Sequence, residues 1–243
     1  MSTPGTIWGV GLGPGDPELM SVKADRLVRR ARHVAFFRKK GRPGHARTLV
    51  DGMLAPETVE HAMEYPVTTE IPLTDPRYNA CLSEFYVECR QNLLSLAGRG
   101  EDVVVLCEGD PFFYGSFMHL YTRLKDEADV RVVPATTGMS AAWTATGQPV
   151  TWGDDVFTVL MGTLAAEDLT KHMAGADALV VMKIGRHLGK VRDALKTAGR
   201  LEDAWLVECA SMPGQSVARL ADVEATTVPY FTIIVVHGNG RRP

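Results

Sequence analysis

The stretch GVGLGPGDPEL, residues 9–19, decides the fold class of this chain. It follows an apolar run at residues 7–10 and precedes apolar residues with the spacing of one helix face. These residues are Met20, Ala24, Leu27, Val28 and Ala31. Asp16 and Pro17 are typical of an N-cap and a first helical position, so we expect the helix to begin there. A strand, a glycine-rich turn and a helix in succession favour an α/β fold.

Short apolar runs alternate with helical stretches along the rest of the chain, which predicts largely parallel sheets. Strands are expected at residues 7–10, 34–37, 103–106, 130–133, 156–161, 178–182, 205–207 and 231–236. Gly199 is placed to end a helix that begins near Arg186. Ligands of such folds bind at the carboxyl ends of the strands. We expect two compact α/β domains, residues 1–134 and 135–243.

The charge of the chain is unevenly distributed. Of its 243 residues 45% are hydrophobic and 23% charged, as in globular proteins, and the net charge of −3 does not favour nucleic-acid binding. Residues 23–47 nevertheless carry a net charge of +9, which leaves −12 for the rest. A local cationic patch on an acidic chain favours a small polyanionic ligand. Candidate substrate-binding residues are Arg38, Lys39, Lys40 and Arg42, with a solvated surface as the alternative.

Targeting segments and metal sites are not expected. No apolar run approaches the length of a membrane span, and no basic residue precedes Lys23 as a signal peptide would require. The cysteines and histidines lack metal-binding spacing. The cysteines are Cys81, Cys89, Cys107 and Cys209. We therefore expect a cytoplasmic protein with reduced thiols, no metal and no membrane or nucleic-acid partner.

The glycine-rich loop at residues 9–19 suggests a bound cofactor but fails the dinucleotide test. Pro14 and Asp16 occupy the positions where G-x-G-x-x-G needs its third glycine. Bases rather than an acid follow Phe37, and they would suit the 2′-phosphate of NADP. An NADP-dependent oxidoreductase therefore remains an alternative, as does a tight turn with purely structural glycines.

A second loop, CEGDPFFYG at residues 107–115, also follows an apolar strand. Gly109 allows a ligand to approach the backbone, and Glu108 and Asp110 resemble a metal pair but have no third ligand near them in the sequence. Asp110-Pro111 repeats the pattern of an N-cap followed by proline, so a capped loop with core aromatics is the alternative reading. The aromatic residues, which would form apolar walls, are Phe112, Phe113 and Tyr114.

A third loop lies in VVPATTGMSAAWTATG, residues 132–147, where Thr136, Thr137 and Gly138 precede a helix of small residues. Free N–H groups at such a helix start can hold a carboxylate. Further strand ends at residues 181–185, 207–215 and 229–236 are polar or irregular, so together the loops predict a cofactor cleft. No nucleophile elbow or Cys/His pair is present in the sequence, which favours group transfer from an activated cofactor.

At these loops the sequence resembles the tetrapyrrole (corrin/porphyrin) methyltransferase family, which uses S-adenosylmethionine. Residues 9–19 with Lys23 and Ala24 match the family's first signature, and CEGDPFFYG matches its second. Residues 132–142 match the third, except that Ala135 stands where the family usually has glycine. The resemblance implies two αβα domains, an active site in the cleft between them, and a homodimer that binds a small tetrapyrrole.

The resemblance also implies which residues contact the cofactor. Those residues are Pro14, Glu108, Gly109, Asp110, Phe113, Tyr114, Thr137, Gly138, Met182, Ala210 and Thr232. Pro14 would lie under the reaction centre. Tyr114 is the candidate catalytic residue, as a general base, and proton loss that needs no base is the alternative.

Several segments resemble the branch that methylates C20 of precorrin-2 in cobalamin biosynthesis, releasing S-adenosylhomocysteine. They include CEGDPFFYGSFMHLYTRL, VMKIGR, ECASMPGQ and PYFTIIVV. Relatives that methylate uroporphyrinogen III carry an acid just after the second strand, where this chain has Phe37 and Arg38. That difference argues against uroporphyrinogen as substrate. Cobalt-factor II is an alternative substrate, and a non-catalytic tetrapyrrole carrier is a further alternative.

Overall fold

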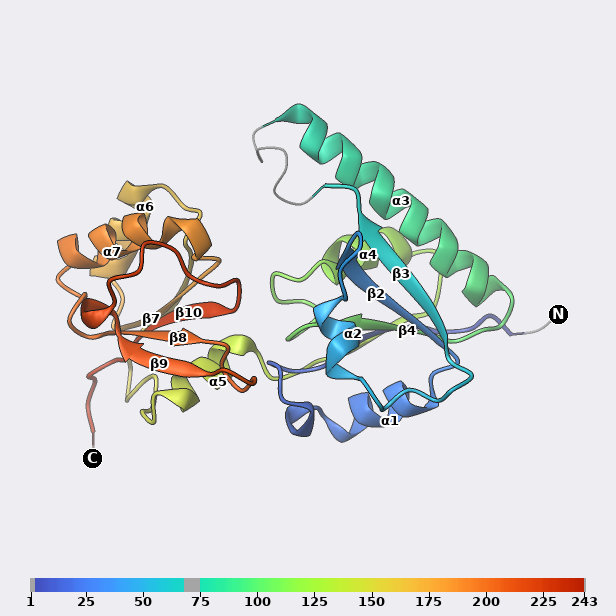
Figure 1. The fold of residues 1–243 in the computed structure, drawn as a ribbon, viewed down its shortest axis with the longest axis horizontal. Coiled ribbons are helices and arrows are strands. Elements are labelled where there is room, and N and C mark those ends of the chain that lie inside the picture. Colours follow the sequence, from blue (N-terminus) through green and yellow to red (C-terminus); the bar gives the residue numbers. More distant parts are fainter. Residues whose placement is uncertain (1–2, 68–74, 243) are drawn as a thin grey trace. The chain divides into compact units, whose positions relative to one another are not determined.

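The computed structural model describes residues 3–67 and 75–242 and divides the chain into two compact units (Figure 1). The N-terminal unit comprises Met1–Thr137 and the C-terminal unit Gly138–Pro243. The division thus falls three residues after the boundary expected at 134/135. Both units are α/β, as the alternation of apolar and helical stretches predicts.

The N-terminal unit contains a five-stranded sheet in the order β3-β2-β4-β1-β5. Its strands are β1 (Ile7–Gly11), β2 (His33–Lys39), β3 (Val59–Tyr65), β4 (Val103–Cys107) and β5 (Val130–Val133). Neighbouring strands are parallel throughout this sheet. Because β4 lies between β1 and β2, the order differs from the 3-2-1-4 order of dinucleotide-binding folds.

Helices cover both faces of this sheet. They are α1 (Val22–Arg30), α2 (His45–Leu49), α3 (Pro76–Gly98) and α4 (Phe117–Leu124), with a 3₁₀ turn η1 (Pro17–Leu19). Alternate residues of β4 point to opposite faces, so Val103 and Val105 pack with α3 and α4. Val104 and Leu106 pack on the other face, with α1 and α2. Burial on both faces explains the continuous apolar run that predicted β4.

The expected start of the first helix is wrong. Asp16 and Pro17 open only η1, where the Asp16 carboxylate accepts a hydrogen bond of 2.9 Å from the Glu18 N–H. The α-helix begins at Val22, and its N-cap is Ser21, whose Oγ accepts from the Ala24 N–H at 3.1 Å. The sequence contains two capping signals in succession, and the second one starts the α-helix.

The C-terminal unit also contains a five-stranded sheet, in the order β6-β7-β10-β8-β9. Its strands are β6 (Phe157–Met161), β7 (Ala178–Met182), β8 (Ala204–Glu208), β9 (Ser216–Arg219) and β10 (Thr232–Val236). The expectation of a largely parallel sheet is wrong here, because β10 runs antiparallel to β7 and β8, and β9 antiparallel to β8. A short connection such as that between β8 and β9 can join only antiparallel neighbours.

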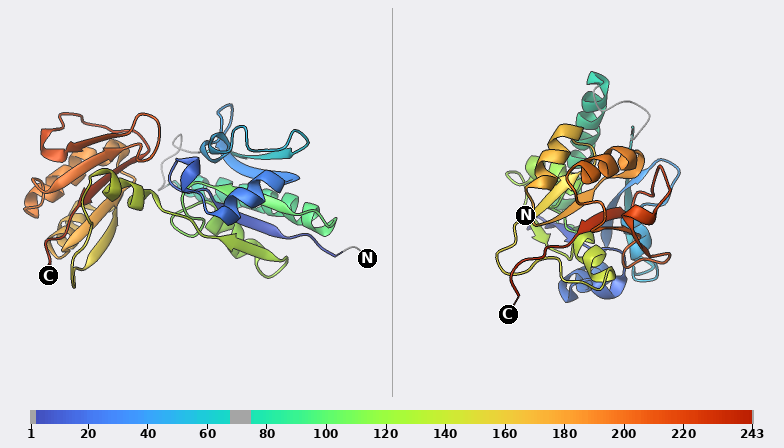
Figure 2. Two further views of the ribbon diagram at one scale, coloured as in Figure 1. Left: turned by 90° about the horizontal axis from the view of Figure 1, so that it is seen from below. Right: turned by 90° about the vertical axis from the view of Figure 1, so that its left-hand side faces the viewer.

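Helices also cover the second sheet (Figure 2). They are α5 (Gly138–Ala145), α6 (Ala166–Ala174) and α7 (Leu188–Thr197), with 3₁₀ turns η2 (Gly185–His187) and η3 (Leu220–Asp222). Leu169 and Met173 of α6 pack with Leu188 and Val191 of α7 in one core, while α5 packs against β8 and β10. Gly199 follows α7 with a φ of +69°, which confirms it as the residue that ends this helix.

Within residues 3–67 and 75–242, no helix combines the length and the apolar character that crossing a membrane would need.

Gly9 in the middle of β1 is expected to be essential for packing. A Cβ at this position would lie 2.2 Å from a ring carbon of the buried Phe117. Gly9→Ala should therefore lower the free energy of unfolding by about 1–3 kcal/mol in urea titrations. Gly98→Ala at the end of α3 is the control, because its Cβ would meet no described atom within 4 Å. Equal stability of the two variants would contradict this explanation.

Candidate active site

The first and second loops, residues 11–16 and 107–115, meet at the carboxyl edge of the N-terminal sheet. Strands β1 and β4 are parallel neighbours with Gly11 opposite Cys107, so the loops that follow them start side by side. The Leu12 N–H donates to the Cys107 carbonyl at 2.9 Å, and the Gly109 N–H donates to the Gly13 carbonyl at 2.9 Å. The two glycine-rich stretches therefore form one paired backbone surface.

The third loop, residues 134–137, joins this surface at Gly11. A Cβ on Gly11 would lie 2.6 Å from the Ala135 Cβ and 2.8 Å from the Gly109 carbonyl oxygen. Both distances are too short for a side chain, so Gly11 is the glycine that lets three loops converge. Gly13 and Gly109 adopt φ values of +84° and +60°, a region that glycine reaches without strain.

Asp110 ties the second loop to the third. Its Oδ1 accepts from the Phe112 N–H and its Oδ2 from the Ala135 N–H, each at 2.9 Å. Asp110 caps the turn at Pro111–Phe112 and not an α-helix, because α4 begins only at Phe117. Both carboxylate oxygens are occupied by loop N–H groups, so the principal contacts of Asp110 are structural.

Glu108 behaves differently from Asp110. Its side chain reaches α2, where its carboxylate accepts a hydrogen bond from the Ala46 backbone and lies near His45. Burial raises the pKa of Glu108, and the charge of His45 and the hydrogen bond from Ala46 oppose this rise. A carboxyl group with a raised pKa in a strand-end loop is a candidate for proton transfer.

The aromatic residues of the second loop separate into two groups. Phe112 packs edge-on against Tyr121 of α4, with ring centroids 4.7 Å apart, while half of its surface remains exposed. The rings of Phe113 and Tyr114 contact each other edge to face, with centroids 4.8 Å apart. Tyr114 has a φ of +53°. A positive φ at a tyrosine costs conformational energy and is found mostly at functional sites.

Pro14 lies buried in the first loop, between Gly13 and Gly15. Both glycines have positive φ, +84° and +141°, so the chain turns sharply on each side of the proline ring. The ring fixes φ and removes an N–H donor, which leaves a rigid apolar element beside the paired loops.

The predicted substrate-binding bases lie at and after the end of β2. Arg38 donates to the Glu64 carboxylate from Nε at 3.0 Å and from Nη2 at 2.7 Å. Lys39, Lys40 and Arg42 are exposed. Elsewhere in the cationic segment, Arg47 binds Glu60 and Asp51. Acids of β3 thus neutralise part of the cationic segment, which sequence reasoning missed because β3 itself was not predicted.

The loops of the C-terminal unit show similar local strain. Lys183, Cys209 and Ser211 adopt φ values of +53°, +49° and +60°. Thr232 is only 2% exposed, and its hydroxyl oxygen is buried. Neither this oxygen nor the buried Ser211 Oγ has a hydrogen-bond partner among the described residues. A buried hydroxyl without a partner is costly and calls for a ligand or water.

Three further predicted cofactor contacts belong to the same unit. Met182 and Ala210 are half-buried, the first at the end of β7 and the second just after β8. Gly138 starts α5, where a Cβ would lie 3.4 Å from Ile233. Ser211 is a further candidate cofactor contact, which the sequence does not predict. The family resemblance points to its neighbour Ala210, and no sequence pattern reveals a positive φ at a serine.

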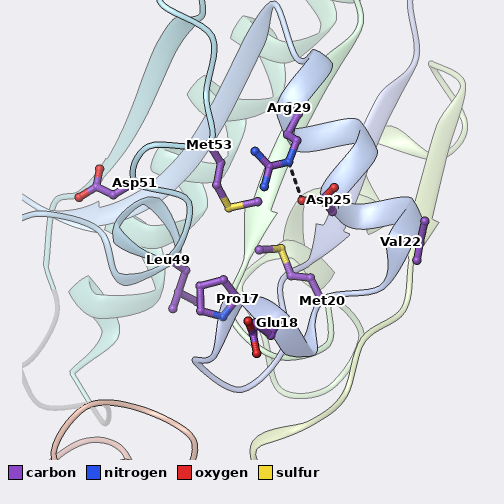
Figure 3. A pocket seen from close by; sticks show the side chains of 9 residues that line it. All are labelled: Pro17, Glu18, Met20, Val22, Asp25, Arg29, Leu49, Asp51 and Met53. Carbon is purple, nitrogen blue, oxygen red and sulfur yellow. Dashed lines mark hydrogen bonds and ion pairs between the residues drawn. The ribbon is translucent and has the colours of Figure 1, made fainter.

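An open pocket of about 450 Å³ lies beside η1, α1 and α2 (Figure 3). Met20, Leu49 and Met53 give it an apolar lining, and Arg29 at its edge is paired with Asp25 at 2.8 Å. Carboxylates of Glu18 and Asp51 also lie around it, so its charge does not suit an anionic substrate.

The described part of the chain contains no group of three or more His, Cys, Asp or Glu side chains arranged to hold a metal ion.

Asp110→Asn is expected to loosen the convergence of the loops. The new amide nitrogen would face an N–H donor, which leaves one hydrogen bond unmade and costs about 1–3 kcal/mol of unfolding free energy. Amide exchange at Ala135 should accelerate in parallel. Asp154→Asn is the control, because the Asp154 side chain is 95% exposed. An unchanged exchange rate at Ala135 would contradict the role of Asp110.

Comparisons with known proteins agree with this arrangement. Residues 6–224 match the sequence model of the Tetrapyrrole (Corrin/Porphyrin) Methylases. The chain is 43% identical over 239 residues to the precorrin-2 C(20)-methyltransferase of Sinorhizobium sp, covering 98% of both chains. It is 44% identical over 242 residues to the cobalamin biosynthesis protein CobIJ of Mycobacterium tuberculosis, where it covers all of this chain but only 48% of that protein.

A solved structure has the same fold. The uroporphyrin-III C-methyltransferase of Thermus thermophilus, crystallised with S-adenosylhomocysteine, matches with a TM-score of 0.64 and 25% identity. The match covers 96% of this chain and 92% of that one.

Proposed function

Since the chain belongs to the tetrapyrrole (corrin/porphyrin) methylases, we propose that it transfers a methyl group from S-adenosylmethionine to C20 of precorrin-2, giving precorrin-3A in cobalamin biosynthesis. The observation that carries this proposal is the 43% identity, over nearly the whole of both chains, to a precorrin-2 C(20)-methyltransferase. Membership of this family argues against the two alternative functions, an NADP-dependent oxidoreductase and a non-catalytic tetrapyrrole carrier. The order of the N-terminal sheet, with β4 between β1 and β2, also argues against a dinucleotide fold.

The residues present suit S-adenosylmethionine. The buried Thr232 hydroxyl lacks a partner among the described residues, and the cofactor has hydrogen-bonding groups to offer it. When bound, the cofactor supplies an activated methyl group that needs no metal or covalent nucleophile for its transfer. The proposed contacts of the N-terminal unit are Pro14, Glu108, Gly109, Asp110, Phe113, Tyr114 and Thr137, and those of the C-terminal unit are Gly138, Met182, Ala210 and Thr232.

Within this proposal the residues act mainly by positioning. The hydrogen bonds among the first three loops hold the backbone in one conformation before the substrate arrives, so little ordering entropy remains to be lost. Pro14 and Phe113 provide apolar surface, which excludes water from the reacting groups. We also propose a homodimer, on the resemblance of the chain to its family.

The cationic residues after β2 are proposed to bind the carboxylates of the macrocycle. Lys40 and Arg42 are exposed, and Arg38 holds one oxygen of Glu64 through two of its nitrogens. Guanidinium groups bind planar carboxylates well. Arg38 can therefore release the Glu64 carboxylate and bind a substrate carboxylate of the same charge in its place.

The substrate is tested by mass spectrometry of the product after anaerobic incubation with S-adenosylmethionine. Precorrin-2, cobalt-factor II and uroporphyrinogen III are offered in parallel. We expect a single methyl group on precorrin-2 alone, because the highly similar relative is a precorrin-2 enzyme. Methylation of cobalt-factor II instead would transfer the proposal to a metallated substrate, and no methylation of any of the three would overturn it.

A further inference from the structure

The second loop is held at its end as well as at Asp110. The loop leads into Ser116, the residue that precedes α4. Tyr65, the last residue of β3, donates its hydroxyl hydrogen to the Ser116 Oγ. Because β2 lies between β3 and β4 in the sheet, this hydrogen bond joins the edge strand to the loop that follows β4. The loop is thus fixed at its start through Asp110 and at its end through Ser116.

Ser116 does not make the contact that is usual for a serine in its position. A serine at the N-cap of a helix normally accepts a hydrogen bond from an N–H of the first helical turn. Ser116 occupies the N-cap of α4, yet its side chain makes no capping hydrogen bond. Its hydroxyl binds Tyr65 instead. This choice of partner indicates that the contact has a role other than starting the helix.

The side chain of Tyr65 is itself held in place by its neighbours. Its ring stacks on Phe37 of β2 with centroids 5.5 Å apart, and it contacts the buried Phe85 of α3 at 5.0 Å. The hydroxyl of Tyr86, also on α3, hydrogen-bonds to Tyr65 and Ser116. Burial raises the pKa of Tyr86, so this hydroxyl keeps its proton. The three hydroxyls therefore form one cluster with a fixed geometry.

The strained residue Tyr114 lies between the two ends of the loop that are held. Its φ is +53°, and it precedes Ser116 by two residues. The loop is tightly folded here, since a Cβ on Gly115 would lie 3.4 Å from the Pro111 carbonyl oxygen. A strained backbone angle persists only where the surrounding structure holds it. The hydrogen bond to Ser116 supplies such a constraint directly after the strained residue.

Tyr114 is one of the cofactor contacts proposed above. We propose that Tyr65 is a positioning residue of the cofactor site: through Ser116 it holds the backbone at Tyr114 in the conformation that binds S-adenosylmethionine. Because the loop is ordered before the cofactor arrives, less conformational entropy is lost on binding. This assignment rests on the proposed function, and Tyr65 itself touches neither cofactor nor substrate in it.

Tyr65→Phe tests the assignment, because it removes the hydroxyl and leaves the ring that stacks on Phe37. We expect the Kd of S-adenosylhomocysteine, measured by calorimetry on the folded protein, to rise roughly three- to ten-fold, the contribution of one hydrogen bond. Amide exchange at Phe113, whose N–H donates to the Asp110 carbonyl at 3.2 Å, should accelerate in parallel. Tyr78→Phe in the first turn of α3 is the matched control, since the Tyr78 hydroxyl makes no hydrogen bond with the described residues. It should change neither quantity.

Ser116→Ala separates positioning from general support of the fold. If Tyr65 acts through Ser116, the double variant should bind S-adenosylhomocysteine no more weakly than the weaker single variant, because either change alone breaks the hydrogen bond. Losses of affinity that add in the double variant would show that the two residues act independently, and would overturn the assignment.

An unchanged Kd in Tyr65→Phe, with or without a loss of stability, would also overturn it. If Tyr65→Phe folds poorly, Tyr86→Phe removes another hydroxyl of the same cluster and should raise the Kd in the same direction. Absence of S-adenosylhomocysteine binding by the wild-type protein would instead contradict the proposed function. The exchange rate at Phe113 would then still decide whether Tyr65 holds the loop.

Discussion

The candidate site depends on the two hydrogen bonds that the Asp110 carboxylate accepts. One hydrogen bond comes from the Phe112 N–H in its own loop, and the other comes from the Ala135 N–H in the next loop. Asp110 therefore holds two strand-end loops together. Gly11 allows the first loop to approach them, because any side chain there would collide with Ala135 and Gly109. Without either feature the backbone of the three loops could not converge at one edge of the sheet.

This arrangement suits a reaction that depends on positioning. A methyl donor that is already activated needs neither a nucleophile nor a metal, so in the proposed reaction the protein contributes mainly alignment and exclusion of water. Under this proposal the backbone hydrogen bonds of the N-terminal unit provide the alignment, and the Pro14 ring helps to exclude water. The positive φ values at Tyr114 in the N-terminal unit and at Lys183, Cys209 and Ser211 in the C-terminal unit place local strain in strand-end loops of both units.

Much of the fold could be predicted from the sequence, because buried strands leave a strong signal. The run at β4 is apolar throughout since both faces of that strand are covered. Strands β3 and β9 were missed, because each lies at an edge of its sheet and neither sequence, VEHAMEY or SVAR, is a continuous apolar run. The antiparallel pairing of β10 was also missed, since strand direction depends on the path of the chain rather than on local composition.

The candidate site could be predicted only in part. The glycine-rich loops were identified from their spacing, because tight turns demand particular residues. The partners of Asp110 and Arg38 could not be predicted, since Ala135 and Glu64 lie 25 and 26 residues away along the chain. Hydrogen bonding distinguishes Asp110 from Glu108, and no sequence pattern reports that Asp110 binds the N–H groups of two loops.

A crystal structure of the protein with S-adenosylhomocysteine would show where the cofactor binds. We expect ligand density against the paired backbone of the first and second loops, with Asp110 still bound to the Phe112 and Ala135 N–H groups. Density elsewhere on the protein, or an Asp110 carboxylate that leaves Ala135 to bind the ligand, would contradict this expectation.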